Sequence, residues 1–316
     1  MARRRFDPLT VFGVPLQGGG LIPILGQQWF VDPNADVFVP KKAWGTGKSD
    51  LNPFRTLEEA LAAANTHDRI FVTGNVREEG LIASNLKFDV HVVGVGGLHH
   101  PDQPSAAYHP GAAMIRPPAA PTADTDLITV RGRGWQFHNI MFDCPVDAAA
   151  VKLVNNGGAG VSEYDASHAI FDGCSFLQGK TAIEVDGPIG NVKVLNSEFG
   201  LLSEAGGCAI FAPTDGGPNF RWKIRNNFFV PAATTEGNKG NQEHIDLALF
   251  SSLIEGNFFG TVEATGHYID LSGGQDNMVV DNYLMGAYAH ADYQDAPGDL
   301  WINYTEAGLT SANPAA

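Results

Sequence analysis

An eight-residue pattern of apolar and polar positions recurs six times between residues 135 and 284. Each copy has an apolar residue, then a turn-tolerant or polar residue two positions later, and it closes on a large apolar residue. Alternation of this kind has the period of a β-strand. The closing residues are 34, 23, 30, 30 and 25 positions apart, and they are Phe142, Phe176, Phe199, Phe229, Phe259 and Leu284. Recurrence with irregular insertions predicts a solenoid.

A second strand-like segment lies before or between successive copies of the pattern, at 126–130, 150–154, 182–185, 209–212, 244–249 and 268–271. Each turn of the solenoid therefore carries at least two short strands, separated by Gly, Asn and Asp clusters. Strands of one turn are expected to hydrogen-bond to the next turn, so that equivalent side chains stack. This predicts an internal ladder of Phe142, Phe176, Phe199, Phe229 and Phe259, and a ladder at the bends of Asn227, Asn257 and Asn282.

This arrangement resembles the right-handed parallel β-helix of the pectate-lyase-like superfamily over residues 36–285. The resemblance implies an all-β fold, a right-handed single-stranded parallel β-helix solenoid. It indicates the fold more strongly than any chemistry, because unrelated activities share such a coil.

The segment 36–80 resembles the usual start of these proteins, where a Gly-rich loop leads to a turn, a short helix and the first strand. Here residues 53–56 form the sequence Pro-Phe-Arg-Thr, and Thr56 with Glu59 fits a capping box. A short amphipathic helix is expected near 56–65. In the family this helix closes the N-terminal mouth of the coil, which would otherwise expose unpaired backbone.

The two ends of the chain do not follow the repeat. Residues 1–35 combine three arginines and a triple glycine with scattered large apolar residues, so we expect an extended N-terminal arm. The arm either folds back over the coil or anchors on another protein. For anchoring, the residues expected to dock are Arg3, Arg4, Arg5, Phe12 and Trp29. The coil is expected over 36–286, with a C-terminal cap or tail over 287–316.

Composition narrows the function classes. The chain has 316 residues and a net charge of −15, which argues against general nucleic-acid binding. Three cysteines without a CxxC spacing indicate neither a disulfide framework nor a zinc site. No apolar run is long enough for membrane insertion, and no signal peptide is evident. The spacing of His99, His100 and His109 fits no known metal site, so neither a metal nor a cofactor is expected.

The best enzymatic arrangement is a column of acids on one outer wall. Aligning the second strands places Lys152, Glu184, Phe211, Asp246 and Asp270 at equivalent positions. Stacked carboxylates repel, which raises one pKa and could provide an acid–base pair for glycoside cleavage. As an enzyme, the chain would use Glu184, Asp246 and Asp270. The competing interpretation is a solvated wall or a subunit interface, and the local motifs of pectate lyases and polygalacturonases are missing.

A β-helix with an apolar, basic N-terminal arm resembles a bacteriophage virion protein of the head-decoration or spike type. The resemblance implies docking on capsid, portal or tail proteins, and a homo-oligomer, with a trimer as one form. Assembly would take place in the host cytoplasm and the final location would be the virion. Two alternatives stay open. One is a lyase or hydrolase that depolymerises a bacterial surface glycan, and the other is a spike that binds a host glycan without cleaving it.

Overall fold

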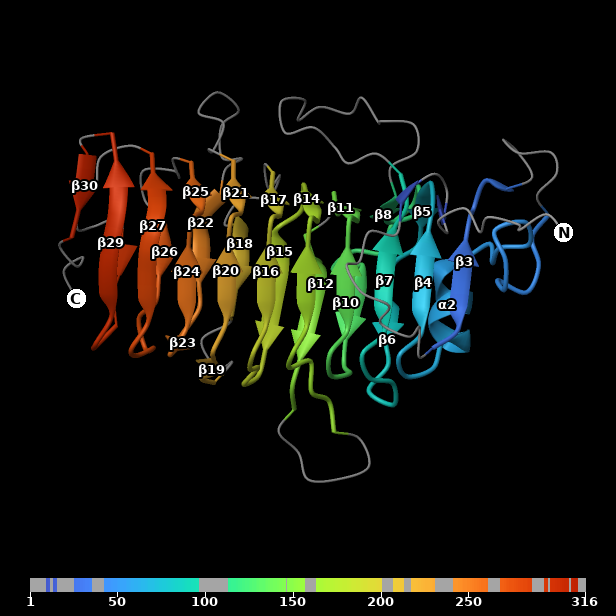
Figure 1. The fold of residues 1–316 in the computed structure, drawn as a ribbon, viewed down its shortest axis with the longest axis horizontal. Helices are drawn as coiled ribbons and strands as arrows, with labels where there is room; N and C mark the ends of the chain where they lie inside the picture. The colour runs from blue at the N-terminus through green and yellow to red at the C-terminus, as the bar shows by residue number, and fades with distance from the viewer. Residues whose placement is uncertain are drawn as a thin grey trace, which may run out of the picture.

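The computed structural model describes residues 10–11, 14–15, 26–35, 43–96, 113–145, 147–156, 163–200, 207–212, 217–230, 241–260, 268–285, 293–294, 296–306 and 308–311. These residues form an elongated coil whose strands stack from the N-terminal end to the C-terminal end (Figure 1). The fold is a parallel β-helix, and the predicted fold class is confirmed.

Three rows of strands run along the coil. The first face consists of β3 (Gln28–Val31), β4 (Arg69–Val72), β7 (His91–Gly94), β10 (Gln136–His138), β13 (Ile170–Asp172), β16 (Lys193–Leu195), β20 (Lys223–Arg225), β24 (Leu253–Glu255), and the first halves of β27 (Met278–Leu284) and β29 (Leu300–Thr305). The second face consists of β5 (Asn75–Arg77), β8 (Met114–Arg116), β11 (Met141–Asp143), β14 (Ser175–Leu177), β17 (Glu198–Phe199), β21 (Phe228–Phe229), β25 (Phe258–Phe259), and the second halves of β27 and β29.

The third face is a separate eight-stranded sheet, which Figure 1 shows behind the first face. Its strands are β6 (Leu81–Ala83), β9 (Ile128–Val130), β12 (Ala149–Val154), β15 (Thr181–Asp186), β18 (Gly207–Phe211), β22 (Asn241–Asp246), β26 (Ile269–Asp270) and β28 (Tyr293–Gln294). Two short pairs lie outside these three faces: β19 (Asn219–Phe220) with β23 (Leu249–Phe250), and β1 (Thr10–Val11) with β2 (Val14–Pro15).

The predicted phenylalanine ladder fills the coil beneath the second face. Ring centroids follow one another at 5.1, 4.9, 4.6 and 4.6 Å, and every interplanar angle is 15° or less. All five side chains are fully buried: Phe142, Phe176, Phe199, Phe229 and Phe259. Because each strand hydrogen-bonds in register to the next, one residue per turn occupies each place in the stack.

The predicted asparagine ladder is also present, and it is one member longer. Asn227 donates from Nδ2 to Oδ1 of Asn257 at 2.9 Å, and Asn257 donates in the same way to Asn282 at 2.8 Å. Asn282 continues the chain to Asn303 at 2.8 Å. All four are buried, so each amide satisfies polar groups that water cannot reach.

The residue before each ladder position turns the chain from the first face to the second. It has a φ between 50° and 66° in all six copies: Asn139, Gly173, Asn196, Asn226, Gly256 and Asp281. Only Gly, Asn and Asp adopt this left-handed conformation readily. The turn-tolerant position of the sequence pattern is explained by this backbone requirement.

The coil is longer at both ends than the repeat predicts, so the boundaries at residues 35 and 286 need correction. Residues 28–31 pair in parallel with β4 and form the first strand of the first face. Residues 300–305 pair in parallel with β27, with Trp301 fully buried inside. The last segment keeps the ladder position, occupied by Asn303, but its pairing with β27 contains an irregularity between Val280 and Tyr283.

The N-terminal end of the coil is covered by a helix and a loop. Helix α2 (Leu57–Ala63) buries Leu57, Ala60 and Leu61 against the first turns, and the predicted capping box of Thr56 and Glu59 is present. The outer edge of β3 hydrogen-bonds to the loop before α2, through Phe30 to Gly47 at 2.8 Å and Phe54 to Phe30 at 2.7 Å. At the other end, β30 (Gly308–Thr310) pairs antiparallel with the second half of β29, and Leu309 is 64% exposed. The covered N-terminal end prevents endless stacking of coils at that end.

Candidate functional site

The acid column of the third face has the predicted register. Glu184 pairs with Phe211, Phe211 with Asp246, and Asp246 with Asp270. The flanking Ile245 is fully buried whereas Asp246 is half-buried, so the acids project outward. Successive members are one strand spacing apart, about 4.8 Å.

The N-terminal part of this column is a charge-paired cluster. Lys152, directly below Glu184 in the register, donates to its Oε1 at 2.7 Å and lies 3.5 Å from Oδ2 of Asp186. Burial disfavours the ammonium, but the Glu184 hydrogen bond and the nearby carboxylates outweigh it, so the pKa of Lys152 is raised. Burial also raises the pKa of Asp126, whose Oδ1 accepts from the Ala149 amide. Glu184 is therefore held in an ion pair.

Asp246 and Asp270 are the two acids that the register brings next to each other. Phe211 separates them from Glu184, so the three predicted catalytic residues form a pair and a remote member. Oδ1 of Asp270 accepts from the Ser272 amide at 2.8 Å. Two adjacent carboxylates on an exposed wall meet the minimum requirement for glycoside hydrolysis, which uses one acid and one base or nucleophile.

His244, which adjoins this column in sequence, is a core residue. It is fully buried, lies between the rings of Phe229, Phe259 and Tyr268, and its Nε2 is 2.8 Å from the Gly260 carbonyl. Burial lowers the pKa of His244 to about 4. Its neutral ring cannot serve as an acid at the surface.

A polar network on the first face was not predicted. Asp89 accepts from Nε2 of Gln136 at 2.8 Å, and lies 3.1 Å from Nδ1 of His67 and 3.4 Å from Nε2 of His91. His138 continues the network, 3.2 Å from Oε1 of Gln136. The His91 and His138 rings stack at 5.7 Å, and burial lowers the pKa of both. Comparing the outward positions of the first-face strands would have revealed this column.

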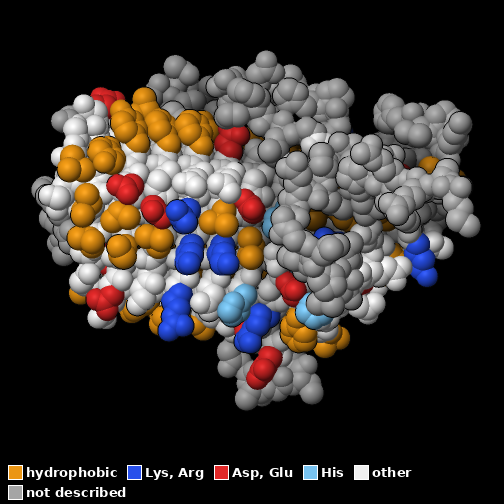
Figure 2. Space-filling view, viewed as in Figure 1, with side chains coloured by type: hydrophobic (Ala, Val, Ile, Leu, Met, Phe, Trp, Pro, Cys, Tyr) orange, Lys and Arg blue, Asp and Glu red, His pale blue; other side chains and the backbone are white. Residues whose placement is uncertain are grey.

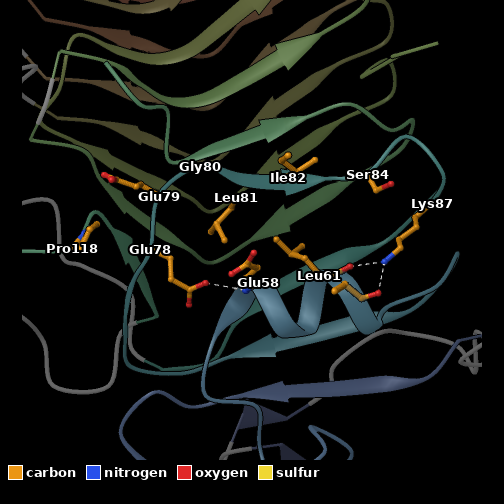
Figure 3. Close-up of a pocket in the computed structure, with 11 residues that line it drawn as sticks. Glu58, Leu61, Glu78, Glu79, Gly80, Leu81, Ile82, Ser84, Lys87 and Pro118 are labelled. Atoms are coloured by element: carbon orange, nitrogen blue, oxygen red, sulfur yellow. Dashed lines mark hydrogen bonds between the residues drawn. The ribbon is translucent and has the colours of Figure 1, made fainter. Parts of the chain in front are cut away.

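A cavity of about 550 Å³ lies beside α2 (Figure 3). Its charged groups hold the helix in place. Glu78 accepts from the amides of Leu57 and Glu58 at 2.7 and 2.9 Å, at the helix N-terminus. Lys87 donates to the carbonyls of Leu61 and Ala62 at 2.5 and 2.8 Å, at the C-terminal end. Each charge has the sign that the helix dipole favours at its end.

Burial raises the pKa of Glu78 and lowers the pKa of Lys87. Both side chains point to the helix, as Figure 3 shows by the dashed contacts. Glu78 and Lys87 are therefore engaged with the backbone of the capping helix. Glu79, which also lines the cavity, accepts from the Thr122 amide through Oε1, whereas its Oε2 is buried without a hydrogen-bond partner.

A further surface lies toward the C-terminal end of the coil, on the outside of the first and second faces. We call it the lateral face. It consists of outward side chains on β16, β20, β21, β24, β25, β27 and β29: Lys193, Lys223, Phe228, Leu253, Phe258, Met278, Tyr283, Leu300 and Tyr304. Figure 2 shows apolar side chains gathered over this end, beside a group of cations. Five of its apolar residues are 37–48% exposed: Phe228, Met278, Tyr283, Leu300 and Tyr304.

The predicted docking residues are mostly not placed by the structure. Arg3, Arg4, Arg5 and Phe12 lie outside the described residues. Trp29 is 7% exposed and donates from Nε1 to Oδ2 of Asp68 at 2.8 Å inside the first turn. Trp29 lies in the first strand of the coil and would be accessible for docking only if that strand detached. We therefore remove Trp29 from the predicted docking residues.

No group of three or more His, Cys, Asp or Glu among the described residues is arranged to hold a metal ion. His99, His100 and His109 lie outside the described residues. In the part of the chain that the structure describes, no helix is long and apolar enough to cross a membrane.

No protein-family model and no curated protein sequence matches this chain. Solved structures do resemble it in fold. Pectate lyase Pel9A shares 13% identity at a TM-score of 0.48, over 88% of this chain and 68% of its own. The PL6 family alginate lyase AlyGC shares 13% identity at a TM-score of 0.47, over 82% of this chain. ORF18 of Geobacillus virus E2 shares 11% identity at a TM-score of 0.42, over 84% of this chain.

The chain spans 32% of the length of the alginate lyase and 60% of the viral protein. One of these proteins, ORF18, is encoded by a virus.

Proposed function

We propose that this chain is a structural component of a bacteriophage virion, as a capsid decoration, spike or other surface appendage protein. It docks through its N-terminal residues and either stabilises the particle or contacts the host surface. The observation that supports this role best is a continuous buried stack of side chains, covered by a helix at its N-terminal end, in a coil whose three cysteines are buried and form no disulfide.

Such a coil is a rigid body that gains its stability from pairing on both sides of every turn. Opening one turn breaks two sets of backbone hydrogen bonds and two aromatic contacts, so local opening is costly. A particle exposed to proteases outside the cell benefits from this property without needing an oxidising environment for assembly. In this proposal the partners are capsid, portal or tail proteins, and the chain forms a homo-oligomer such as a trimer.

The test compares full-length chain with a chain that lacks residues 1–25. The deletion must stop there, because the Gln27 amide donates to Oδ1 of Asp68 and residues 28–31 form the first rung. Both forms are expressed during infection by the phage that encodes the chain, and virions are purified. Equal circular dichroism of the two purified forms shows that the coil is intact.

We expect the full-length chain to copurify with virions and the truncated chain to be absent from them. Substitution of Arg3, Arg4 and Arg5 by Ser in the full-length chain should weaken copurification in the same direction. If full-length chain is absent from purified virions, the virion role is excluded. If the truncated chain copurifies equally well, the chain docks through the coil.

A second candidate is depolymerisation of a bacterial surface glycan, and the observation that favours it is the adjacent pair Asp246 and Asp270. The test is release of new reducing ends or unsaturated products from capsular and lipopolysaccharide preparations. Asp246→Asn and Asp270→Asn should each abolish the release, whereas Asp186→Asn on the same wall should not. Binding that persists in all three variants without release would identify a glycan-binding spike instead.

A further inference from the structure

The lateral face has the composition of a protein interface. Its exposed apolar residues are aromatic, Met and Leu, and aromatic residues and Met are enriched where proteins meet. The rings of Phe228 and Phe258 stack at 4.7 Å, and those of Phe258 and Tyr283 at 5.4 Å, each pair at 12°. The ring faces are thus occupied by neighbouring rings and the edges point outward. A sugar ring needs an open aromatic face, so this ladder suits an apolar protein surface better than a glycan.

The cations of the lateral face indicate the charge of the partner. Lys193 pairs with Lys223 in the register of β16 and β20, and both side chains are exposed. Neither has an ion-pair partner among the described residues. Like charges directly opposite each other on neighbouring strands are destabilising. The repulsion between Lys193 and Lys223 is offset best by an acidic surface on a partner. The chain itself has 35 acidic and 20 basic residues.

The chain carries a matching surface on its third face. Lys223 in β20 and Asp246 in β22 belong to the same turn of the coil, and Asp270 belongs to the next. Two coils that lie side by side in the same direction place equal turns at equal heights. Lys223 of one coil then meets Asp246 of the other, and Lys193 lies at the height of Phe211.

We propose that the lateral face packs against the acid column of a second copy of this chain. The helix that covers the N-terminal end favours a side-by-side contact over an end-to-end contact. Because the two contacting surfaces differ, a pair leaves the acid column of one copy and the lateral face of the other free for further copies, and the contact closes into a ring when its rotation allows. This contact does not depend on a virion location.

The test that identifies the contacting residues is cross-linking between two tagged variants. Lys223→Cys is placed in one and Asp246→Cys in the other, and a short bismaleimide is added to each alone and to the mixture. The three natural cysteines are buried and should not react. Cross-linked dimer is expected in the mixture only. Cross-linking of Lys223→Cys to itself, with none in the mixture, would show a face-to-face contact and overturn the proposal.

The energetic test is sedimentation at physiological ionic strength. Lys193→Glu with Lys223→Glu should weaken self-association by about tenfold or more, and adding Asp246→Lys with Asp270→Lys should restore it. Lys48→Glu, an exposed site away from both surfaces, is the charge control. A wild-type chain that stays monomeric at tens of micromolar, or that binds purified glycan as a monomer through the lateral face, would also overturn the proposal. Circular dichroism establishes that each variant is folded.

Discussion

Asn257 and Asn282 are joined by two hydrogen bonds to a single oxygen. Oδ1 of Asn282 accepts from the backbone amide of Asn257 at 2.9 Å and from its side-chain Nδ2 at 2.8 Å. The same Nδ2 also donates to the Ile224 carbonyl at 2.9 Å. One buried side chain therefore satisfies polar groups on two neighbouring turns, and the turns cannot separate without losing those bonds.

Replacing Asn257 by Leu should destabilise the coil by about 3–5 kcal/mol, because the Asn227 amide groups and the Ile224 carbonyl lose buried partners. The measurement is the free energy of unfolding in denaturant. Asn226→Gly is the matched control, because Asn226 is exposed and has the left-handed φ that Gly173 and Gly256 adopt at equivalent positions. A loss as large in the control would show that the ladder is not the cause.

Phe229 is fully buried, whereas its neighbour Phe228 is 37% exposed. Phe229→Ala should cost about 3–5 kcal/mol, since it leaves a cavity in the stack, whereas Phe228→Ala should cost about 1 kcal/mol or less. Phe229→Leu should be intermediate, because Leu284 occupies the same column two turns later. Thermal melting of the three variants checks the order, and equal losses at the two positions would contradict the assigned faces.

His244 should make the coil sensitive to acid. The pKa of His244 is about 4 in the folded chain, against an ordinary value of 6.5, because burial disfavours the charged ring. Between pH 4 and pH 6.5 the unfolded chain therefore binds more protons than the folded chain. The contribution of His244 to the free energy of unfolding is complete above pH 6.5, and it falls by about 3 kcal/mol in total as the pH decreases to 4.

His244→Phe removes this titration and should flatten the pH dependence of the unfolding free energy. It also loses the contact with the Gly260 carbonyl, so it should be less stable than the natural chain at neutral pH by about 1 kcal/mol. His67→Gln is the control, because His67 is a surface histidine in a different network. An unchanged pH slope in His244→Phe would refute the assignment.

Lys87 should hold the C-terminal end of the capping helix. Lys87→Met keeps the length of the side chain but removes the donors to the Leu61 and Ala62 carbonyls. Faster hydrogen exchange is expected over 57–64, with a stability loss of about 1 kcal/mol. Lys180→Met is the control, because its ion pair with Asp147 is at the surface and such pairs contribute little. Equal exchange rates in both variants would contradict the role of Lys87.

The repeat alone was enough to predict the coil, both ladders and the register of the acid column. The reason is the constancy of strand pairing: equivalent residues of successive turns must stack when each turn bonds in register to the next. Alternation along each strand then separates inside from outside. The capping helix was predictable for a local reason, since Thr56 and Glu59 satisfy helix amides without help from the rest of the chain.

Tertiary pairing decided what the repeat does not encode. The run Gln28–Val31 does not alternate, and its pairing with β4 is what buries Trp29. Alternation from Ile245 would place His244 outside, yet the register puts it beside Ala209, at a corner where two consecutive residues face the core. The same holds for His67 and Asp89 of the histidine network, which lie outside the strands. Their meeting depends on which turns become neighbours, and the spacing within either segment carries no record of that.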